Sequence, residues 1–264
     1  MSCLLNEARQ NSVYELVRQR GSVRVTELEE LLHVSDMTIR RDLGDLARKG
    51  LIRRVHGGAM LVEGARTEQT FVARQVEELE RKAAIARLAA TLLKGGETIY
   101  LDAGTTCHEL AKRLTNDMDL KVVTDSLAIL RELLNRKNLE VTILGGTLEK
   151  DENALGGPLA QANAEKLAVD CCFFSARGFT RDRITNPGMI GTTIKKTMIR
   201  HASKVILLAD STKFNQRGFI EICRWKEVDV LVTDSGVTRR ALKPIAARRV
   251  EIHIAALGKT GAQT

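Results

Sequence analysis

Prolines are few in this sequence and long apolar runs are missing. Only three prolines occur among 264 residues, so we expect no stiff proline-rich linker. No stretch approaches the roughly 18 uninterrupted apolar residues of a membrane helix, and no basic segment followed by a sustained apolar run opens the chain. Repeats at solenoid periods and low-complexity tracts are also lacking. We therefore expect a cytoplasmic globular protein that is neither exported nor inserted in a membrane.

The cysteines lack the paired spacing of a metal site, and we expect reduced thiols with no bound metal and no cofactor. Cys171 and Cys172 are neighbours, so on a strand their side chains should point to opposite faces. The remaining cysteines are scattered along the chain at Cys3, Cys107 and Cys223.

Composition predicts two globular units and an anionic partner. The length exceeds one typical domain, and 44% hydrophobic residues supply a core. The formal net charge of +8 favours an anion, but charge alone does not choose among nucleic acid, a membrane surface and a phosphorylated metabolite.

Residues 1–62 have the pattern of a winged helix-turn-helix. Apolar residues recur at helical spacing in 7–18, and Thr26 is a candidate cap for a second helix. Ser35 is a candidate cap for a third helix, whose inward-facing residues are Ile39, Leu43 and Leu46. The segment 51–62 predicts a hairpin with a glycine-containing turn.

Basic residues concentrate on the third helix and the strand after it, where a duplex would lie. A solvated basic face is the plainer explanation, but the preceding helix and the following hairpin favour DNA. The first residues of this helix would enter the major groove, so the candidates for base contacts are Ser35, Met37, Thr38 and Arg41. The other predicted DNA contacts are Arg40, Arg53 and Arg54 for phosphates, with His56 and Gly57 in the turn.

A linker over 63–76 and a second domain over 77–264 follow. Six β-rich runs alternate with helix-like stretches, which predicts an α/β domain with a parallel or mostly parallel sheet flanked by helices. The runs are Thr98–Leu101, 122–124, 141–144, 171–174, 205–208 and 228–232.

Polar and small residues follow several of these strands. Such residues at a strand-to-helix turn can present donors to a phosphate, and the carboxyl ends of the strands converge on the ligand crevice of an open α/β sheet. Each feature alone is more often a cap, a turn or a surface lysine. Their joint placement predicts an anion site from the segments 102–106, 124–126, 145–146 and 210–213.

Three further features carry a resemblance to a known family. Arg9, the run 34–43 (VSDMTIRRDL) and the run 55–59 (VHGGA) resemble the N-terminal signature of the DeoR family at its usual spacing. The resemblance implies a repressor of a carbohydrate-catabolism operon that binds double-stranded operator DNA as a homo-oligomer, a dimer or a tetramer. It also implies a C-terminal sensor with the fold of ribose-5-phosphate isomerases and glucosamine-6-phosphate deaminases, responding to phosphorylated sugars or related metabolites.

The resemblance assigns effector-binding roles to strand-end residues. A phosphate site is implied at Asp102, Gly104, Thr105 and Thr106. The rest of the ligand would be surrounded by Asp125, Ser126, Gly145, Gly146, Gly156, Arg177, Gly178 and Lys213.

The sequence departs from the family pattern in three places. Asp125 replaces the usual Asn, which exchanges a donor for a carboxylate that only accepts when ionised. The stretch 175–179 lacks an acidic residue that is often present, and the glutamate usually seen before Lys195-Lys196 is missing. From Arg177, with Arg181 or Arg183 nearby, we hypothesise that the ligand bears a second anionic group.

Two other functions remain open at this stage. A sugar-phosphate isomerase or deaminase would suit the related fold, but it needs positioned acid and base groups. Cys107 and His108 form no complete set of nucleophile, base and orienting group, so we expect no catalytic residues. A structural nucleic-acid-binding protein would fit the charge but leaves the strand-end motifs unexplained.

Overall fold

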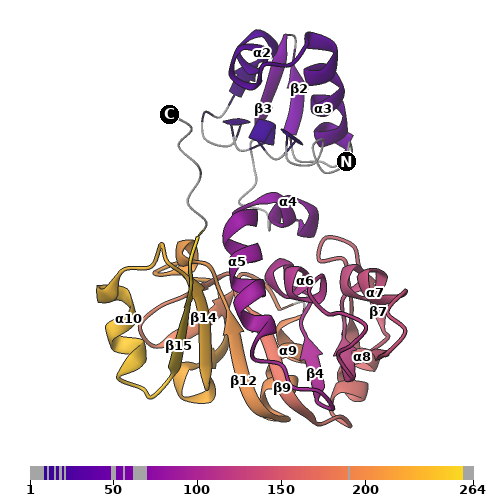
Figure 1. The fold of residues 1–264 in the computed structure, drawn as a ribbon, viewed down its shortest axis with the longest axis vertical. Helices are drawn as coiled ribbons and strands as arrows, with labels where there is room; N and C mark the ends of the chain where they lie inside the picture. Colours follow the sequence, from indigo (N-terminus) through magenta and orange to yellow (C-terminus); the bar gives the residue numbers. More distant parts are fainter. Residues whose placement is uncertain are drawn as a thin grey trace. The chain divides into compact units, whose positions relative to one another are not determined.

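The computed structural model describes residues 9–10, 12–14, 16–17, 20, 22–48, 52–55, 57–61, 70–189 and 191–257. Contacts along the chain divide it into two compact units, Met1–Glu77 and Glu78–Thr264, which Figure 1 shows in indigo and in magenta to yellow.

The first unit is a winged helix, as predicted. The described residues of 9–20 are helical, and a three-stranded antiparallel sheet in the order β1-β3-β2 forms the wing. Its elements are β1 (Ser22–Arg24), α2 (Val25–Leu32), α3 (Asp36–Arg48), β2 (Ile52–Val55) and β3 (Gly58–Leu61). The predicted inward residues Ile39, Leu43 and Leu46 are buried against Val13 and Leu28.

Two details of this unit differ from the sequence prediction. Thr26 does not cap α2, because the helix already begins at Val25 with Arg24 at the cap position, where its backbone N–H donates to Glu27 Oε2 at 3.4 Å. The predicted linker contains a short helix, α4 (Phe71–Val76), whose cap Thr70 accepts a hydrogen bond from the backbone N–H of Ala73.

The second unit is built on a seven-stranded sheet in the order β15-β14-β12-β9-β4-β5-β6, in which every neighbouring pair is parallel. The strands are β4 (Thr98–Leu101), β5 (Leu120–Thr124), β6 (Leu139–Ile143), β9 (Val169–Ser175), β12 (Ala202–Leu208), β14 (Val230–Asp234) and β15 (Glu251–Ala255). The six strands expected from sequence are all present. The edge strand β15 is an addition.

Helices cover both faces of this sheet (Figure 1). One face carries α5 (Leu79–Ala90), α6 (Thr105–Ala111) and α7 (Leu127–Leu133). The other carries α8 (Gly157–Ala164), α9 (Thr192–Arg200) and α10 (Arg239–Ala246).

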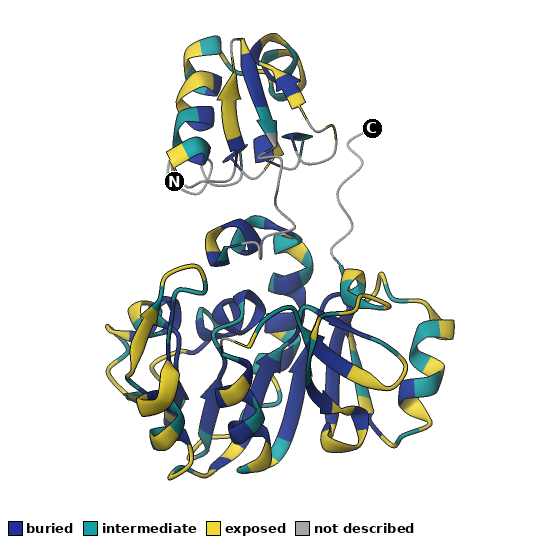
Figure 2. Ribbon diagram, turned by 180° about the vertical axis from the view of Figure 1, so that it is seen from behind, coloured by how far each residue is buried: buried dark blue, intermediate teal, exposed yellow. Residues whose placement is uncertain are grey.

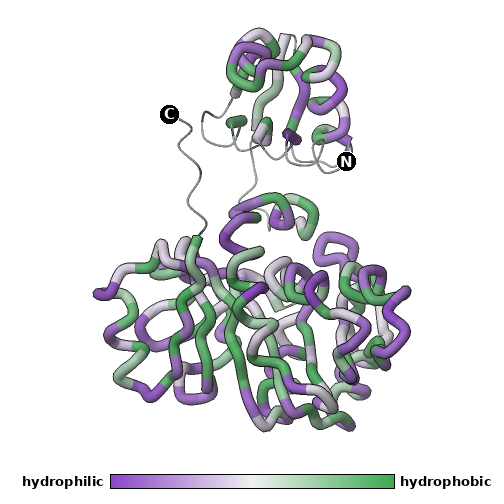
Figure 3. Tube along the Cα trace, in the orientation of Figure 1, coloured by the Kyte–Doolittle hydropathy of each residue, from purple (hydrophilic) through white to green (hydrophobic). Residues whose placement is uncertain are grey.

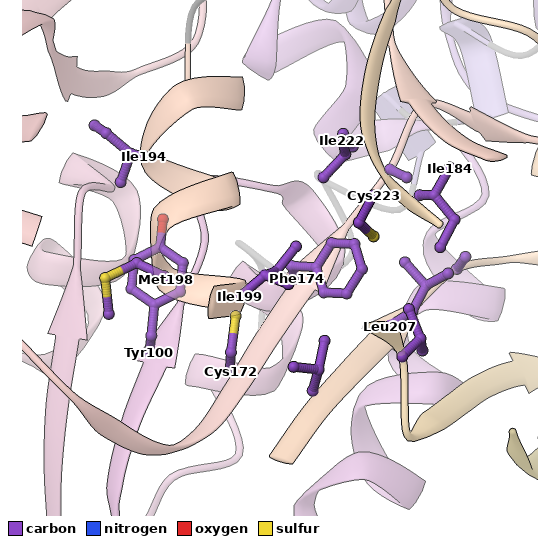
Figure 4. Packing of buried hydrophobic residues seen from close by; sticks show 14 of the residues in the cluster. Tyr100, Cys172, Phe174, Ile184, Ile194, Met198, Ile199, Leu207, Ile222 and Cys223 are labelled. Atoms are coloured by element: carbon purple, nitrogen blue, oxygen red, sulfur yellow. The ribbon is translucent and has the colours of Figure 1, made fainter. Parts of the chain in front are cut away.

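Alternating residues of the central strands fill the two cores. Cys171 and Phe173 of β9 lie in the core under α5, α6 and α7, whereas Cys172 and Phe174 lie in the core under α8, α9 and α10 (Figure 4). The predicted opposition of the two cysteines is therefore confirmed. Strands buried on both faces are hydrophobic along most of their length. The central strands of the sheet are largely buried in Figure 2 and largely hydrophobic in Figure 3.

Shorter antiparallel strands form two small additional sheets in the second unit. One pair is β7 (Thr147–Glu149) with β8 (Ala154–Gly156), and a three-stranded sheet has the order β10-β11-β13. Its members are β10 (Gly178–Phe179), β11 (Arg183–Asn186) and β13 (Ile220–Arg224), with the 3-10 turns η1 (Ser211–Lys213) and η2 (Trp225–Glu227) nearby in the chain. The sequence analysis predicted none of these strands.

Among the described residues, no helix combines the length and the apolar character needed to traverse a lipid bilayer.

Candidate functional site

The strand order identifies where a ligand site is expected in the second unit. After β4 the chain builds β5 and β6 on one side, and it then returns to place β9 on the other side of β4. In open α/β sheets, ligands bind outside the carboxyl ends of the strands where the order reverses in this way. The segments that follow β4 and β9 flank this point, and both were predicted to bind the effector.

A buried ion pair joins the ends of these two strands. Lys195 of α9 donates to Asp102 Oδ2 at 2.6 Å, and their side chains are 10% and 0% exposed. Lys195 Nζ also donates to the backbone oxygen of Ser175 at 2.7 Å, and the backbone N–H groups of Ser175 and Gly104 donate to Asp102, each at 2.8 Å. We call Asp102, Ser175 and Lys195 the switch-point cluster.

Electrostatics favour the charged form of Lys195. Burial is the largest single effect and lowers its pKa, but the nearby Asp102, Cys107 and Asp125 together raise it, and the net pKa lies above the ordinary value. Since protein donors already surround Asp102, its carboxylate positions the loop and the lysine. Lys195 and Ser175 were not among the predicted effector residues. Lys195 lies on the same face of α9 as the buried Met198 and Ile199. A lysine among apolar residues of one helix face is the signal that could have indicated a buried partner.

The predicted phosphate loop has a structural role of its own. Gly104 is the cap of α6, and a Cβ there would lie 1.8 Å from Ser175 Oγ, so close packing alone requires glycine at this position. Thr105 and Thr106 form the first turn of α6 and are 7% and 5% exposed.

Asp125 lies at the end of β5 and is 2% exposed. Burial and the nearby Asp102 carboxylate raise its pKa to about 7, although the Tyr100 hydroxyl donates to Asp125 Oδ1 at 3.0 Å and opposes the rise. Near neutral pH a substantial fraction of Asp125 is therefore protonated and able to donate, as the family's usual Asn would. The sequence alone gave no indication of this, because the shift depends on burial in the folded chain and on the nearby Asp102.

The other residues predicted after β5 and β6 have structural roles. Ser126 caps α7 by accepting from Ile129 N–H at 3.3 Å, and Leu155 N–H donates to Asp125 O at 2.8 Å. The glycines are required by positive φ angles or by close approach of another part of the backbone. Gly145 and Gly146 have φ of 73° and 111°, and a Cβ on Gly146 would lie 2.3 Å from the backbone oxygen of Gly156.

Lys213 follows β12, in η1. Its Nζ lies 3.9 Å from Asp210 Oδ2, and its side chain is 24% exposed. Within the described residues, no hydrogen bond or ion pair joins Lys213 to Asp125 or to the switch-point cluster. Gly178 is required by packing, since a Cβ there would lie 2.6 Å from the backbone oxygen of Gln216.

The three arginines of the second-anion hypothesis lie in different surroundings. The backbone N–H of Arg177 donates to Asn186 Oδ1 at 3.2 Å. Arg183 pairs with Glu221 at 3.3 Å. Arg181 lines a separate cleft beside Phe179 and α10. The hypothesis of a second anionic group on the ligand therefore stays a prediction.

A second network links η1 to the beginning of α5. Arg81 Nη1 donates to Ser211 Oγ and to Asp234 Oδ2, each at 2.7 Å, and its Nε donates to Glu78 at 2.7 Å. Asp234 is fully buried, and it also accepts from Ser211 N–H at 2.7 Å. Glu78 has a φ of 48° and precedes α5 directly. The sequence analysis did not identify this network.

Cys107 and His108 do not have the properties of catalytic groups. Burial and Asp102 raise the pKa of the Cys107 thiol well above its ordinary value, so the thiolate is disfavoured. Burial, with a smaller effect of Lys112, lowers the pKa of His108 to about 4.

In the first unit, the predicted DNA surface is exposed on α3. Met37 is 81% exposed. Ser35 and Thr38 share a hydrogen bond of 3.0 Å between their hydroxyl oxygens. Arg41 is exposed and has no hydrogen bond or ion pair within the described residues.

Acidic side chains on α3 are already paired. Asp42 is fully buried and accepts from Arg9 Nε at 2.6 Å, which explains the signature pairing of Arg9 with this helix. Asp36 pairs with Arg40, a predicted phosphate contact, and Asp45 pairs with Arg48. The positive charge of Arg41 is therefore not neutralised by a direct partner.

The wing supplies the other predicted contacts. Arg53 and Arg54 of β2 are exposed, and Arg53 Nη2 lies 3.1 Å from Met60 Sδ. Gly57 is exposed with a φ of 76°, a conformation that favours glycine. His56 lies outside the described residues.

Comparison with known proteins covers both units. The DeoR-like helix-turn-helix domain matches residues 9–64, and the DeoR C terminal sensor domain matches residues 77–235. The chain is 35% identical over 259 residues to the uncharacterized HTH-type transcriptional regulator YulB of Bacillus subtilis, covering 98% of this chain and 100% of that protein. It is 31% identical over 230 residues to the lactose phosphotransferase system repressor of Staphylococcus epidermidis, covering 86% and 91%.

Among solved structures, ribose 5-phosphate isomerase A from Methanocaldococcus jannaschii is 18% identical with a TM-score of 0.38, covering 50% of this chain and 53% of that chain. That likeness is weak, and the parallel sheet of the second unit is established by its own strand order.

Proposed function

Because the chain belongs to the DeoR family of DNA-binding transcriptional regulators, we propose that it represses a carbohydrate-catabolism operon in the cytoplasm. A phosphorylated sugar or a related anionic metabolite releases it from the operator. The observation that carries the sensing half is the buried Asp102–Lys195 pair at the sheet's reversal point. A buried ion pair is weak evidence for stability. Its placement at the expected ligand crevice supports a role in shaping the ligand site instead.

The DNA-binding half of the proposal assigns base contacts to Ser35, Met37, Thr38 and Arg41, which begin the second helix of the motif. Phosphate contacts go to Arg53 and Arg54, with His56 and Gly57 in the turn of the wing. Arg40 also contacts a phosphate, but its ion pair with Asp36 must break first.

The ligand half places the phosphate near Thr105 and Thr106. Asp102 and Gly104 shape that loop. Lys213 supplies a positive charge from the end of β12. Asp125 hydrogen-bonds a ligand hydroxyl from the end of β5, beside Ser126, Gly145, Gly146 and Gly156. Arg177 and Gly178 close the site on the β9 side.

Ligand binding reaches the DNA-binding unit through Arg81 in this proposal. A ligand drawn to Lys213 displaces η1, and Ser211 of η1 shares Arg81 with Glu78 at the start of α5. The ligand changes DNA affinity only by its differential affinity for the two states. Two copies reading two half-sites make a homodimer the smallest functional assembly, and a tetramer is the alternative.

The test is DNA binding by the full chain to the region upstream of its own gene, screened against sugar phosphates and other phosphorylated metabolites. We expect one compound to weaken specific binding at least tenfold. Lys213→Ala should bind the DNA normally and lose that response, while Lys226→Ala on η2 should keep it. Specific binding that no compound alters would remove the sensing half of the proposal. Turnover of a compound without specific DNA binding would replace the proposal with an enzyme.

A further inference from the structure

A cleft toward the β15 end of the sheet is lined by none of the three switch-point residues. It has a volume of about 410 Å³ and is formed by residues 179–181, by Phe214 and Asn215 after η1, and by residues at the start of α10 and within it. Figure 1 shows α10 beside β14 and β15, at the opposite end of the sheet from α7. Of the residues that line this cleft, only Arg181 was considered for the effector, in the hypothesis of a second anionic group.

One wall of the cleft is a fixed aromatic cluster. Phe179 is 1% exposed, and its ring meets that of Phe214 edge to face, with ring centroids 4.4 Å apart. On another side, Trp225 packs against Phe179 at 5.3 Å. Ile245 and Pro244 of α10 complete the apolar lining. Because buried neighbours hold Phe179, this wall is formed before any ligand binds.

Two cations border the apolar wall. Arg181 and Arg240 both line the cleft and are exposed, and neither has a hydrogen bond or ion pair within the described residues. Three arginines of the same region that do not line this cleft are already paired, Arg183 and Arg224 with Glu221 and Arg248 with Asp182. The local acidic side chains are thus occupied, and the two cleft guanidinium groups retain their donors for an anion.

A hydroxyl completes the lining. Thr238 caps α10, and its Oγ accepts from Ala241 N–H at 3.3 Å. Its own hydroxyl proton remains available to donate, since an oxygen that accepts still carries its hydrogen. Asn215 and Thr180 add further polar groups to the rim.

We propose that this cleft binds a small anion carrying an aromatic or heteroaromatic ring, independently of the effector crevice. Guanidinium groups pair with phosphate or carboxylate oxygens in a planar, often bidentate geometry. A ring can pack on the half-buried Phe214, which Phe179 holds in place, and gains from contact with a guanidinium group of the lining. The cleft volume falls in the range of small-ligand sites, about 300–1,000 Å³. A sugar phosphate has no flat apolar face and leaves the wall uncovered.

The experiment is isothermal titration of the DNA-free full chain with three probes, namely phenyl phosphate, inorganic phosphate and phenol. We expect phenyl phosphate to bind at least tenfold more tightly than either of the other two, because only it engages both the arginines and the wall. Binding of phenyl phosphate no tighter than that of inorganic phosphate overturns the proposal.

Variants locate the binding. Arg181→Ala and Arg240→Ala should each weaken phenyl phosphate at least fivefold. Arg239→Ala, the neighbouring arginine that does not line the cleft, should leave it unchanged, and so should Lys213→Ala. Binding lost in Lys213→Ala but kept in Arg181→Ala and Arg240→Ala would assign it to the crevice and overturn the proposal. Because no DNA is present, these results are independent of whether the repressor proposal holds.

Discussion

Replacing Lys195 by methionine leaves a buried carboxylate without its cation. The side chain of Asp102 is 0% exposed and that of Lys195 is 10% exposed, so solvent replaces little of the lost interaction. Removing one partner of a buried ion pair costs about 3–5 kcal/mol. Asp102 keeps the N–H donors of Ser175 and Gly104, so we expect Lys195→Met to cost about 3 kcal/mol, at the lower end of that range.

A double-mutant cycle isolates the charge. In the Asp102→Asn background the Lys195 ammonium is itself left without its anion, so Lys195→Met removes that unpaired charge together with the bond to the Ser175 backbone oxygen, and its net cost should be no more than about 1 kcal/mol. The neighbouring substitution Lys196→Met should change the free energy of unfolding by less than about 0.5 kcal/mol.

Urea unfolding followed by tryptophan fluorescence measures these differences. The chain has one tryptophan, Trp225, which is fully buried in the second unit and reports that unit alone. An equal cost of Lys195→Met with and without Asp102 would refute the reasoning, because the two groups would then not be coupled.

Three further predictions concern Asp125, Arg41 and Arg81. Because the pKa of Asp125 is raised from 3.8 to about 7, the folded chain holds a proton that the unfolded chain loses, and stability falls as pH rises from about 4 to about 7. The free energy of unfolding should fall by up to about 1.4 kcal/mol per pH unit in the unsubstituted chain, and Asp125→Asn should lack this fall. Urea unfolding across that pH range measures the difference. Parallel pH profiles of the two chains would contradict the prediction. Arg41→Ala should weaken operator binding in fluorescence anisotropy by about 1–3 kcal/mol, whereas Arg48→Ala, already paired with Asp45, should cost less; equal losses would contradict the assignment. Arg81→Ala should retain metabolite binding in calorimetry but reduce the effect of the metabolite on DNA affinity, while the exposed Arg87→Ala should not; an unchanged effect in Arg81→Ala would exclude the proposed link.

The predicted elements followed from local patterns. The spacing of Ile39, Leu43 and Leu46 defines the buried face of α3, and residues 98–101 form β4 as expected, because burial on two faces leaves a continuous apolar run. Arg24 replaced Thr26 as the cap of α2 since the position of the wing, not the capping preference alone, determines where that helix begins. Val25 N–H donates to the backbone oxygen of Gly57 at 2.9 Å.

The candidate site was predicted in outline, by strand ends, but its ion pairs were not. Asp102 and Lys195 lie on elements far apart in the sequence, and no local pattern pairs them. The same holds for Arg81 with Asp234. Several glycines that were predicted to contact the ligand are required by close packing, whether or not they also bind ligand. Examples are Gly104 against Ser175 and Gly178 against Gln216. A glycine motif alone does not separate these two causes.

Reciprocal linkage tests the central claim most directly. Once the screen has identified a releasing metabolite, its affinity for the full chain is measured by calorimetry with and without saturating operator DNA. If the metabolite and the operator favour different states, operator must weaken metabolite binding by the same factor by which the metabolite weakens operator binding, at least tenfold here. Metabolite affinity that is identical with and without operator would contradict the account.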